Sequence, residues 1–204
     1  MKKLLLAILL TVVPVSNLSA KLISQTRVPA SDTSELISPK TGVNYAQLQD
    51  MLSQEQWRRA NYKTRELLLR AAGREAAGWA DVASIEKLAC WDIAKVERLW
   101  QDYSNGRFGL ASQFPVFIST GNKPGTTNQE AYQRFGETVG WREEGRWKGI
   151  QNFTYNLSAP SGHLPSAYFS TFSIYGNDLV VTTYFKRAAD CGVVNQSSSL
   201  DIVK

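Results

Sequence analysis

The sequence contains very few of the residues that build catalytic or metal sites. Its 204 residues include one histidine, His163, and two cysteines, Cys90 and Cys191. A Ser-His-Asp triad would have to use His163, yet no nucleophile-elbow pattern is present. The same residues make no recognisable zinc site, and the phosphate-binding patterns GxxxxGK[ST] and GxGxxG are absent. The sequence therefore predicts a protein that is not an enzyme and has no metal site.

The sequence also lacks a long apolar run. The stretch at 4–15 has about twelve residues, whereas a membrane-spanning helix needs about 20. Two lysines precede this stretch and the small residue Ala20 follows it, which is the pattern of a signal peptide over residues 1–20. We therefore expect export to a periplasm, a thylakoid lumen or the extracellular space, with no transmembrane span after removal of the signal. The alternative is a membrane anchor formed by an uncleaved N-terminal segment.

The distribution of charge along the chain does not indicate a nucleic-acid-binding surface. The net charge is +5, and without the two lysines of the signal peptide 21 basic residues stand against 18 acidic ones. The basic residues alternate with acidic ones, as in Arg142-Glu143-Glu144, instead of forming a stripe. We expect no nucleic-acid partner.

The two cysteines both follow the predicted signal peptide. An even pair in an exported chain predicts a disulfide between Cys90 and Cys191, whereas in a cytosolic chain the same pair would more often be two buried thiols.

Apolar residues at helical spacing predict a mainly α-helical domain over residues 44–192. Residues 21–43 are rich in Ser, Thr and Pro without aromatic residues, so we expect a flexible linker there, and we expect a disordered tail at 193–204. Helices are expected from a cap at Asn44, over 55–72, near 85–89, from a cap at Asp92, over 131–139, and from Asp178 to a stop at Gly192.

Two segments do not follow the helical spacing. Residues 111–119 are predicted to be extended, with Pro115 arguing against a central strand. Residues 145–165 mix aromatic residues with Gly, Asn, Ser and Pro, which suits a long ordered loop of a kind that is often functional.

The aromatic residues in and around these segments fit a core, because aromatic residues dominate cores. They equally fit an apolar pocket for a flat ligand.

Five sequence blocks resemble one known family. They are WRRANYKTRELLLRAAG at 57–73, IEKLACWDI at 85–93, LWQDYSNGRFGL at 99–110, GWREEGRW at 140–147 and FTYNLSAPSGHLP at 153–165. Together they resemble the genomes-uncoupled-four family, the porphyrin-binding regulators of magnesium chelatase in oxygenic phototrophs. YSNGRFG and LSAPSGHLP, in this order, are the most specific blocks, and a weaker similarity to the family follows at 183–191.

The resemblance implies a compact, irregular helical domain shaped like a cupped hand, with long ordered loops. Its apolar palm would bind protoporphyrin IX or Mg-protoporphyrin IX as a ligand, with no covalent cofactor. The protein would then act as a carrier, sensor or regulator of tetrapyrrole metabolism, including chlorophyll biosynthesis. The alternative is an exported protein-interaction domain that has kept the fold, binds another protein on the cupped surface and has lost pigment binding.

Three departures from the family pattern bear on that role. Members that activate the chelatase carry an arginine pair shortly after GHLP, whereas this chain has no basic residue between Ser166 and Lys186. The tryptophan expected in the loop after Trp147 is also absent. An exported chain would, in addition, be separated from a cytosolic or stromal chelatase, so the fold carries over more safely than the regulation.

The predicted ligand site combines apolar and cationic residues. A porphyrin presents a large apolar face and two propionates, so its site needs apolar side chains against the ring and cations or amide donors at the rim. We expect a structural hydrogen bond from His163 rather than metal ligation. The residues predicted to line one concave surface are Phe114, Phe117, Trp147, Ile150, Phe153 and Tyr155, with Arg107, Lys148 or His163 at its edge.

Overall fold

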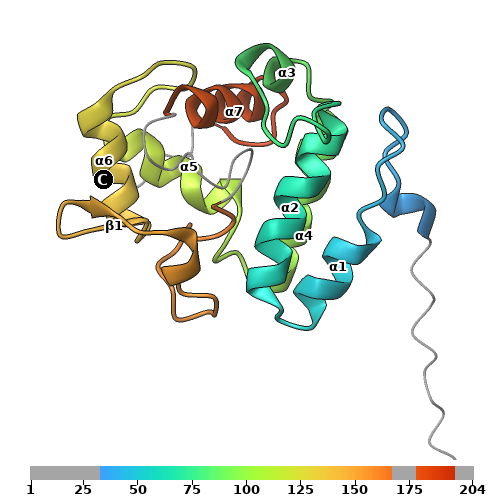
Figure 1. The fold of residues 1–204 in the computed structure, drawn as a ribbon, viewed down its shortest axis with the longest axis horizontal. Helices are drawn as coiled ribbons and strands as arrows, with labels where there is room; N and C mark the ends of the chain where they lie inside the picture. The colour runs from blue at the N-terminus through green and yellow to red at the C-terminus, as the bar shows by residue number, and fades with distance from the viewer. Residues whose placement is uncertain (1–32, 167–177, 196–204) are drawn as a thin grey trace, which may run out of the picture. The chain divides into compact units, whose positions relative to one another are not determined.

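The structure, a computed structural model, describes residues 33–166 and 178–195. The predicted signal peptide, the first part of the predicted linker, the segment 167–177 and the end of the tail lie outside the described residues. The chain divides into two compact units, residues 1–31 and 32–204, and the described residues all belong to the second. Their secondary structure is mainly helical, which confirms the predicted fold class (Figure 1).

The described residues form seven α-helices, two short 3-10 helices and one antiparallel hairpin. No described helix is both long and apolar enough to cross a membrane. The elements are η1 (Thr33–Leu36), α1 (Ala46–Ser53), α2 (Trp57–Ala71), α3 (Val82–Glu86), α4 (Cys90–Ser104), α5 (Leu110–Ser119), α6 (Gln129–Thr138), β1 (Arg142–Glu143), β2 (Arg146–Trp147), η2 (Ile150–Asn152) and α7 (Asp178–Asp190).

Helices α1, α2 and α4 pack together around one part of the core (Figure 1). Trp57 of α2 lies edge-on to Phe108, with ring centroids 5.5 Å apart. Trp100 of α4 is buried beside both rings, and its indole N–H donates a hydrogen bond to the Thr64 hydroxyl at 2.9 Å. The indole N–H of Trp100 is therefore satisfied although the ring is fully buried in the α2–α4 contact.

A second aromatic cluster joins α5, α6 and α7. Phe117 of α5 stacks on Phe185 of α7 with centroids 4.4 Å apart, and Phe135 of α6 meets Phe117 edge-on at 5.6 Å. All three side chains are fully buried. Burial of one large aromatic side chain contributes about 1.5–3 kcal/mol, so this cluster is a main reason why α7 stays docked.

The prediction of an extended segment at 111–119 is wrong, because these residues form α5. Pro115, which was weighed only against a central strand, lies inside the helix and lacks the N–H that would bond one turn back. The buried residues of α5, however, are Leu110, Gln113, Phe114 and Phe117. Their spacing of i, i+3, i+4 and i+7 is that of an amphipathic helix, and burial of this face outweighs the cost of the proline.

The second half of the predicted linker is part of the fold. Leu36 and Val43 are buried in the core, and Ile37 forms a β-bridge with Asn44. The carboxylate of Asp92 accepts a hydrogen bond from the Tyr45 hydroxyl at 2.9 Å and a longer one from Thr41. Helix α4 starts before Asp92, so this residue fastens the N-terminal segment instead of capping the helix.

Helix α7 matches its prediction in spite of its β-branched residues. Val180, Thr182 and Thr183 are buried, so tertiary packing compensates for their lower helix propensity. The helix is followed by Gly192 at φ +68°, as its C-terminal stop requires. The order continues past the predicted domain end, since Val194 is also buried.

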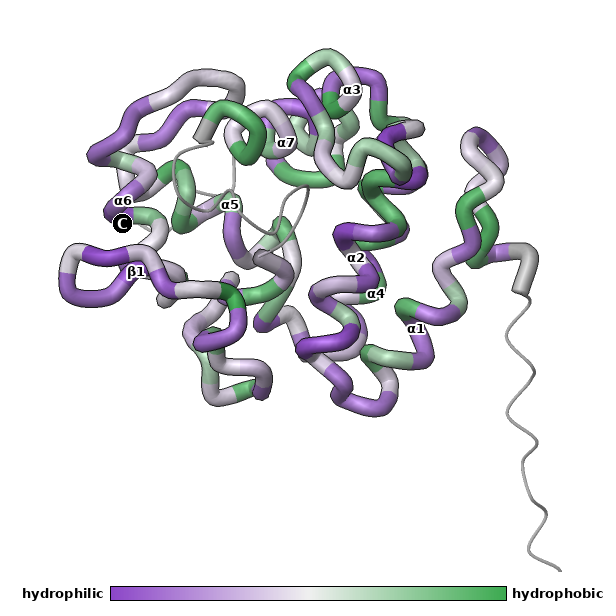
Figure 2. The backbone as a smooth tube through the Cα atoms, in the orientation of Figure 1, coloured by the Kyte–Doolittle hydropathy of each residue, from purple (hydrophilic) through white to green (hydrophobic). Residues whose placement is uncertain are grey.

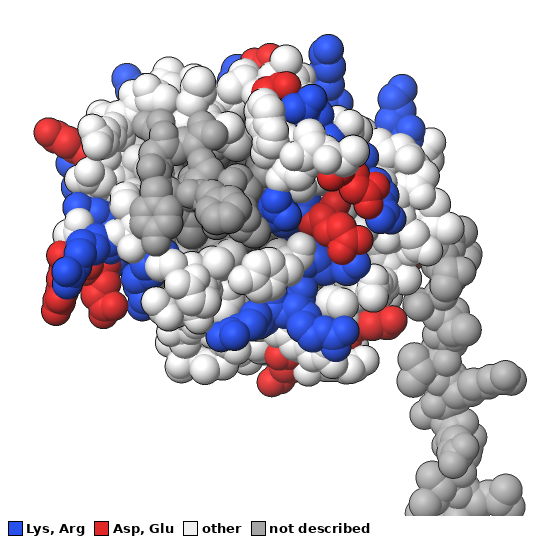
Figure 3. Space-filling model, viewed as in Figure 1, with Lys and Arg blue, Asp and Glu red and all other residues white. Residues whose placement is uncertain are grey.

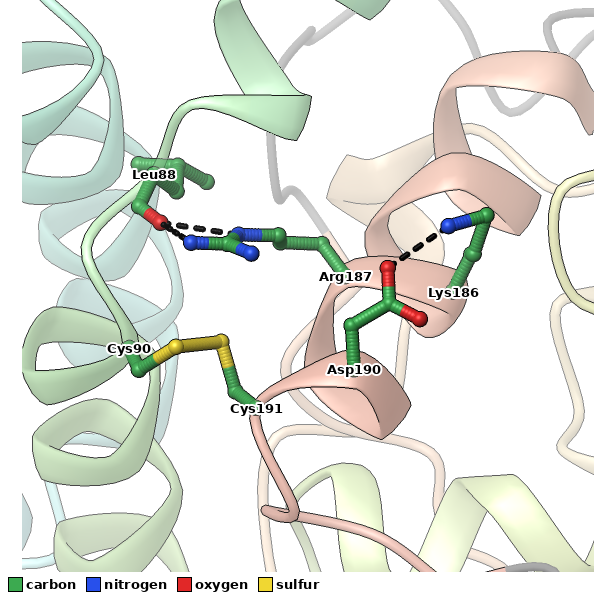
Figure 4. Close-up of a disulfide and its surroundings, with 6 residues drawn as sticks. All are labelled: Leu88, Cys90, Lys186, Arg187, Asp190 and Cys191. Atoms are coloured by element: carbon green, nitrogen blue, oxygen red, sulfur yellow. Dashed lines mark hydrogen bonds and ion pairs between the residues drawn. A yellow bond between two sulfur atoms is a disulfide. The ribbon is translucent and has the colours of Figure 1, made fainter.

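The disulfide predicted between Cys90 and Cys191 is present (Figure 4). It joins the start of α4 to the end of α7 across 101 residues, with Cα atoms 5.2 Å apart. Arg187 reinforces the same contact, because its Nε and Nη2 donate to the Leu88 carbonyl oxygen at 2.9 and 2.7 Å. Thus α7 is attached to the helices before it by a covalent bond, a guanidinium and the aromatic cluster.

We expect the Cys90→Ser/Cys191→Ser double variant to lose about 3–5 kcal/mol of unfolding free energy, because a loop of this length is no longer closed in the unfolded chain. Urea unfolding of the variant, of the oxidised protein and of the reduced protein measures this loss. Reduction should lower the midpoint of the wild type and leave the variant unchanged. Equal midpoints for oxidised and reduced wild type would contradict the expectation.

Candidate functional site

The two most specific sequence blocks lie against each other in the structure. The Gly109 N–H donates to the Leu164 carbonyl oxygen at 2.8 Å, and the Gly162 N–H donates to the Arg107 carbonyl oxygen at 2.9 Å. These two hydrogen bonds join the turn after α4, residues 105–109, to residues 158–165, here called the motif loop. Two blocks that are more than fifty residues apart in the chain thus form one unit of structure.

Side chains strengthen this junction on both sides. The Gln113 amide is fully buried and donates to the carbonyl oxygens of Gly162 and Pro165, each at 2.9 Å. Arg107 donates through Nε and Nη2 to the Ala159 carbonyl oxygen at 2.9 and 2.6 Å. The carbonyl groups of Ala159, Gly162, Leu164 and Pro165 thus accept hydrogen bonds in a loop that contains no regular element.

Two glycines are required at this junction. Gly109 has φ +104°, and a Cβ there would lie 2.8 Å from the Glu97 carboxylate. Gly162 has φ +75°, and a Cβ there would lie 3.1 Å from Gln113. Both positions combine a left-handed backbone with a close neighbour, so a larger residue would separate the two segments.

Glu97 fixes the start of α5 from the opposite side. Its buried carboxylate accepts the backbone N–H groups of Leu110 and of Ala111, the latter at 2.8 Å. Removal from water raises the pKa of Glu97 to about 7, although the two N–H donors act in the other direction. A carboxylate at a helix N-terminus satisfies donors that have no partner within the helix.

His163 has a structural role, as the sequence analysis expected. It is buried; Nε2 accepts the Thr154 N–H at 3.2 Å, and Nδ1 therefore donates to the Val139 carbonyl oxygen at 2.6 Å. Burial lowers the pKa of the imidazole, and the nearby Lys148 ammonium adds to this effect. Both nitrogens are occupied, so neither is available to ligate a metal.

The predicted concave surface of six residues does not form as expected. Phe114 and Phe117 belong to the aromatic core cluster, and Phe153 is buried against the His163 ring at a centroid distance of 4.8 Å. Their burial follows from the helical face of α5 and from the docking of the motif loop. A contact of these three side chains with a ligand stays a prediction, but in this structure they are core residues.

The other predicted residues remain partly exposed. They are Trp147, Lys148, Ile150 and Tyr155. Trp147 packs on Tyr132 with ring centroids 5.3 Å apart, and Lys148 pairs with the Glu143 carboxylate at 3.4 Å. Arg107 is committed to the motif loop. Of the three predicted cations, none is therefore free of a protein partner.

A different cation lies beside the partly exposed loop. The Arg58 guanidinium of α2 stacks on the Tyr155 ring, 4.8 Å from its centroid, and its Nη2 donates to the Gln151 carbonyl oxygen at 3.3 Å. Tyr62, one turn later on α2, is 38% exposed and acts electrostatically on the Tyr155 hydroxyl. We call Arg58, Tyr62, Ile150 and Tyr155 the α2–loop face.

Arg58 and Tyr62 were not among the site residues predicted from the sequence. The signal was present in the block WRRAN at 57–61, where two arginines begin a helix whose first turn has no acidic residue. Positive charge at a helix N-terminus interacts unfavourably with the helix dipole. Helix stability therefore does not explain the two arginines at this position. The face shown in Figure 3 carries a band of Lys and Arg side chains where the start of α2 meets the 150–155 loop. The turn between β1 and β2 is also hydrophilic (Figure 2).

A small pocket elsewhere does not suit a tetrapyrrole. It is lined by Ala111, Phe114, Pro115, Val193, Val194 and Asn195 and has a volume of about 160 Å³. Pockets for drug-sized ligands have about 300–1,000 Å³, and a porphyrin is at least of that size. Among the described residues, no group of three or more His, Cys, Asp or Glu side chains could hold a metal ion.

Comparison with known proteins identifies relatives of the domain. A family model described as GUN4-like matches residues 38–175. A Ycf53-like protein of Synechocystis sp. is 30% identical over 127 residues, which make up 61% of this chain and 51% of that protein. A chloroplastic tetrapyrrole-binding protein of Arabidopsis thaliana is 24% identical over 138 residues, or 62% and 49% of the two chains. This chain thus spans about half the length of the curated relatives that it matches.

Solved structures agree with this assignment. The structure of GUN4 from Chlamydomonas reinhardtii matches with a TM-score of 0.55 at 26% identity, over 76% of this chain and 92% of that one. The ligand-free structure of Arabidopsis thaliana GUN4 also gives a TM-score of 0.55, at 22% identity, over 69% and 90%, and supports the fold alone.

The raised pKa of Glu97 predicts a pH-dependent stability. Its folded pKa of about 7 lies above the unfolded value of 4.5, so the folded state binds the proton more tightly. Its contribution is fully present below pH 4.5 and is lost as pH rises through about 7, a change of about 3 kcal/mol. The stability difference between wild type and Glu97→Gln should therefore fall between pH 5 and pH 8 in urea titrations. A difference that stays constant with pH would contradict this.

Proposed function

Because the chain belongs to the GUN4-like family, we propose that it binds a tetrapyrrole, protoporphyrin IX or its magnesium complex, without catalysing a reaction. The observation that carries the proposal is the extent of the family match. Residues 38–175 include the turn after α4, the motif loop and the whole α2–loop face. The relative from Arabidopsis thaliana that is named a tetrapyrrole-binding protein supports the choice of ligand class.

The α2–loop face suits such a ligand in its chemistry. A tetrapyrrole is flat and apolar and carries carboxylates at one edge. The face offers the partly exposed side chains of Tyr62, Ile150 and Tyr155 beside one guanidinium. Aromatic rings bury large area with little loss of side-chain freedom, and a cation at their edge matches the carboxylates.

The biological role that follows is that of a carrier, sensor or regulator of tetrapyrrole metabolism. Regulation would require a protein partner, and a magnesium chelatase is the partner that the resemblance implies. In an exported chain the carrier and sensor roles fit better, because the chelatase would lie in another compartment. Proteins with the same fold can bind different molecules, so the surface residues determine which ligand and which partner this chain binds.

We further propose that the chain is exported, with a mature N-terminus near Lys21. The basis is the two lysines, the short apolar stretch and the small residue Ala20. N-terminal sequencing of the protein isolated from a membrane-enclosed or extracellular fraction should find this terminus. An intact Met1 on a cytosolic protein would refute export, and an intact Met1 in the membrane fraction would indicate the anchored form.

Titration with protoporphyrin IX tests ligand binding. We expect saturable quenching of tryptophan fluorescence together with a shift of the Soret band. Tyr155→Ala should weaken binding by about 1–3 kcal/mol, or about 5- to 150-fold in Kd, because an aromatic contact with the ring is lost. Thermal melting of the variant, measured without ligand, must show that it remains folded.

Trp79→Ala provides a matched control. Trp79 is 52% exposed and packs on Arg74, which follows α2 at the end opposite Arg58. From Arg58 to Ala71, the last residue of α2, the helix rises about 20 Å, so an aromatic residue held beyond that end lies far from the α2–loop face. The control should bind like the wild type. Equal affinities of a folded Tyr155→Ala and the wild type would place the site elsewhere, and no binding by the wild type would favour the interaction-domain alternative.

A further inference from the structure

We propose that Arg58 is the residue that pairs with a carboxylate of the ligand on the α2–loop face. This inference rests on the proposed function, because it names the anchor for the tetrapyrrole propionate. It differs from the sequence-based expectation, which placed the cation at Arg107, Lys148 or His163.

The contacts of those three residues argue against them. Both donating nitrogens of Arg107 point to the Ala159 carbonyl oxygen at 2.9 and 2.6 Å, so its loss would release the motif loop. His163 is buried, and its pKa is lowered by that burial, so the ring stays neutral near pH 7. Lys148 already has a carboxylate partner in Glu143, at 3.4 Å.

Arg58 is in a different situation. It is exposed, and among the described residues no carboxylate lies within ion-pair distance of it. Among the described residues its one hydrogen bond goes to the Gln151 carbonyl oxygen, and at 3.3 Å this bond is long. A guanidinium carries five N–H donors, so the described part of the chain uses only a small share of its donor capacity.

The orientation of the Arg58 guanidinium is nevertheless fixed. It stacks on the Tyr155 ring, and that ring is held by a hydrogen bond from its hydroxyl to the Ile150 carbonyl oxygen at 2.7 Å. The neighbouring Asn61 side chain accepts the Ser166 N–H at 2.8 Å and joins α2 to the end of the motif loop. The cation is thus positioned by α2 beneath it and by an aromatic platform beside it.

Stacking on an aromatic ring leaves the edge of the guanidinium free. The attraction to the ring acts through the face of the guanidinium plane, whereas its N–H groups lie in that plane. A carboxylate can therefore accept two parallel hydrogen bonds from the edge while the stacking persists. The apolar body of the same ligand would then lie over Tyr62 or Tyr155, which are the aromatic side chains next to this edge.

The adjacent residue provides an internal control. Arg59 has the same charge and is also exposed, but its Nη1 donates to the Gln56 side chain at 2.5 Å, and no aromatic ring in the described part of the chain holds it. Removing either arginine changes the net charge equally. A general electrostatic attraction would therefore respond equally to both substitutions, whereas a specific carboxylate anchor would respond to one.

The test compares Arg58→Gln and Arg59→Gln with two ligands, protoporphyrin IX and its dimethyl ester, in the same detergent solution. The ester lacks the carboxylates. We expect Arg58→Gln to weaken binding of the free acid at least tenfold and to leave ester binding within twofold of wild type. Arg59→Gln should leave the affinity for both ligands within twofold.

The outcomes separate this inference from the proposed function. Wild-type protein that binds neither ligand refutes the proposed function and the inference with it. Wild-type binding together with an unchanged affinity of Arg58→Gln for the free acid refutes the inference alone. Equal loss of acid and ester binding in Arg58→Gln would mean that Arg58 supports the loop without pairing with a carboxylate, which also overturns it. Equal effects of the two substitutions would show unspecific charge attraction and overturn it as well.

Discussion

The docking of the motif loop on the turn after α4 is the constraint on which the rest of the structure depends. This docking consists of two main-chain hydrogen bonds, one from Gly109 and one from Gly162, closed by the buried amide of Gln113. It holds the loop that carries Tyr155 against α2, and it sets the start of α5 above Glu97. A buried segment without regular structure is stable only when its polar groups find such partners.

This docking also explains which of the basic side chains have protein partners and which remain for a ligand. The Arg107 guanidinium donates to a carbonyl oxygen of the motif loop, and the His163 ring bonds to the backbone of Thr154 and Val139, so these polar atoms have protein partners rather than a ligand. The partly exposed residues that remain lie on the other side of the loop, toward the start of α2. There, Arg58 is positioned by stacking and lacks a charged partner among the described residues. The proposed binding function thus depends on residues that the fold holds in place but whose charged groups do not stabilise the motif loop.

Much of the helical framework could be predicted from the sequence. The periodic apolar residues of α2 and the glycine stop at Gly192 are local signals, and the structure confirms them. Helix α5 was missed because residues 111–119 were interpreted as extended, although the buried face of this helix has the i, i+3, i+4, i+7 spacing. The order at 33–43 was missed because it depends on Asp92, a partner about fifty residues away. Exposure of Arg58 likewise depends on tertiary contacts, which local sequence patterns do not encode.

Amide hydrogen exchange with and without protoporphyrin IX tests the central claim, that ligand binding uses the α2–loop face, most directly. Amides gain protection where a ligand orders the backbone or excludes water. If the ligand binds there, amides at 150–155 and in the first turn of α2 exchange more slowly when pigment is added, with little change near Trp79. Protection confined to the pocket lined by Ala111 and Val194, or no change anywhere at saturating pigment, would contradict it.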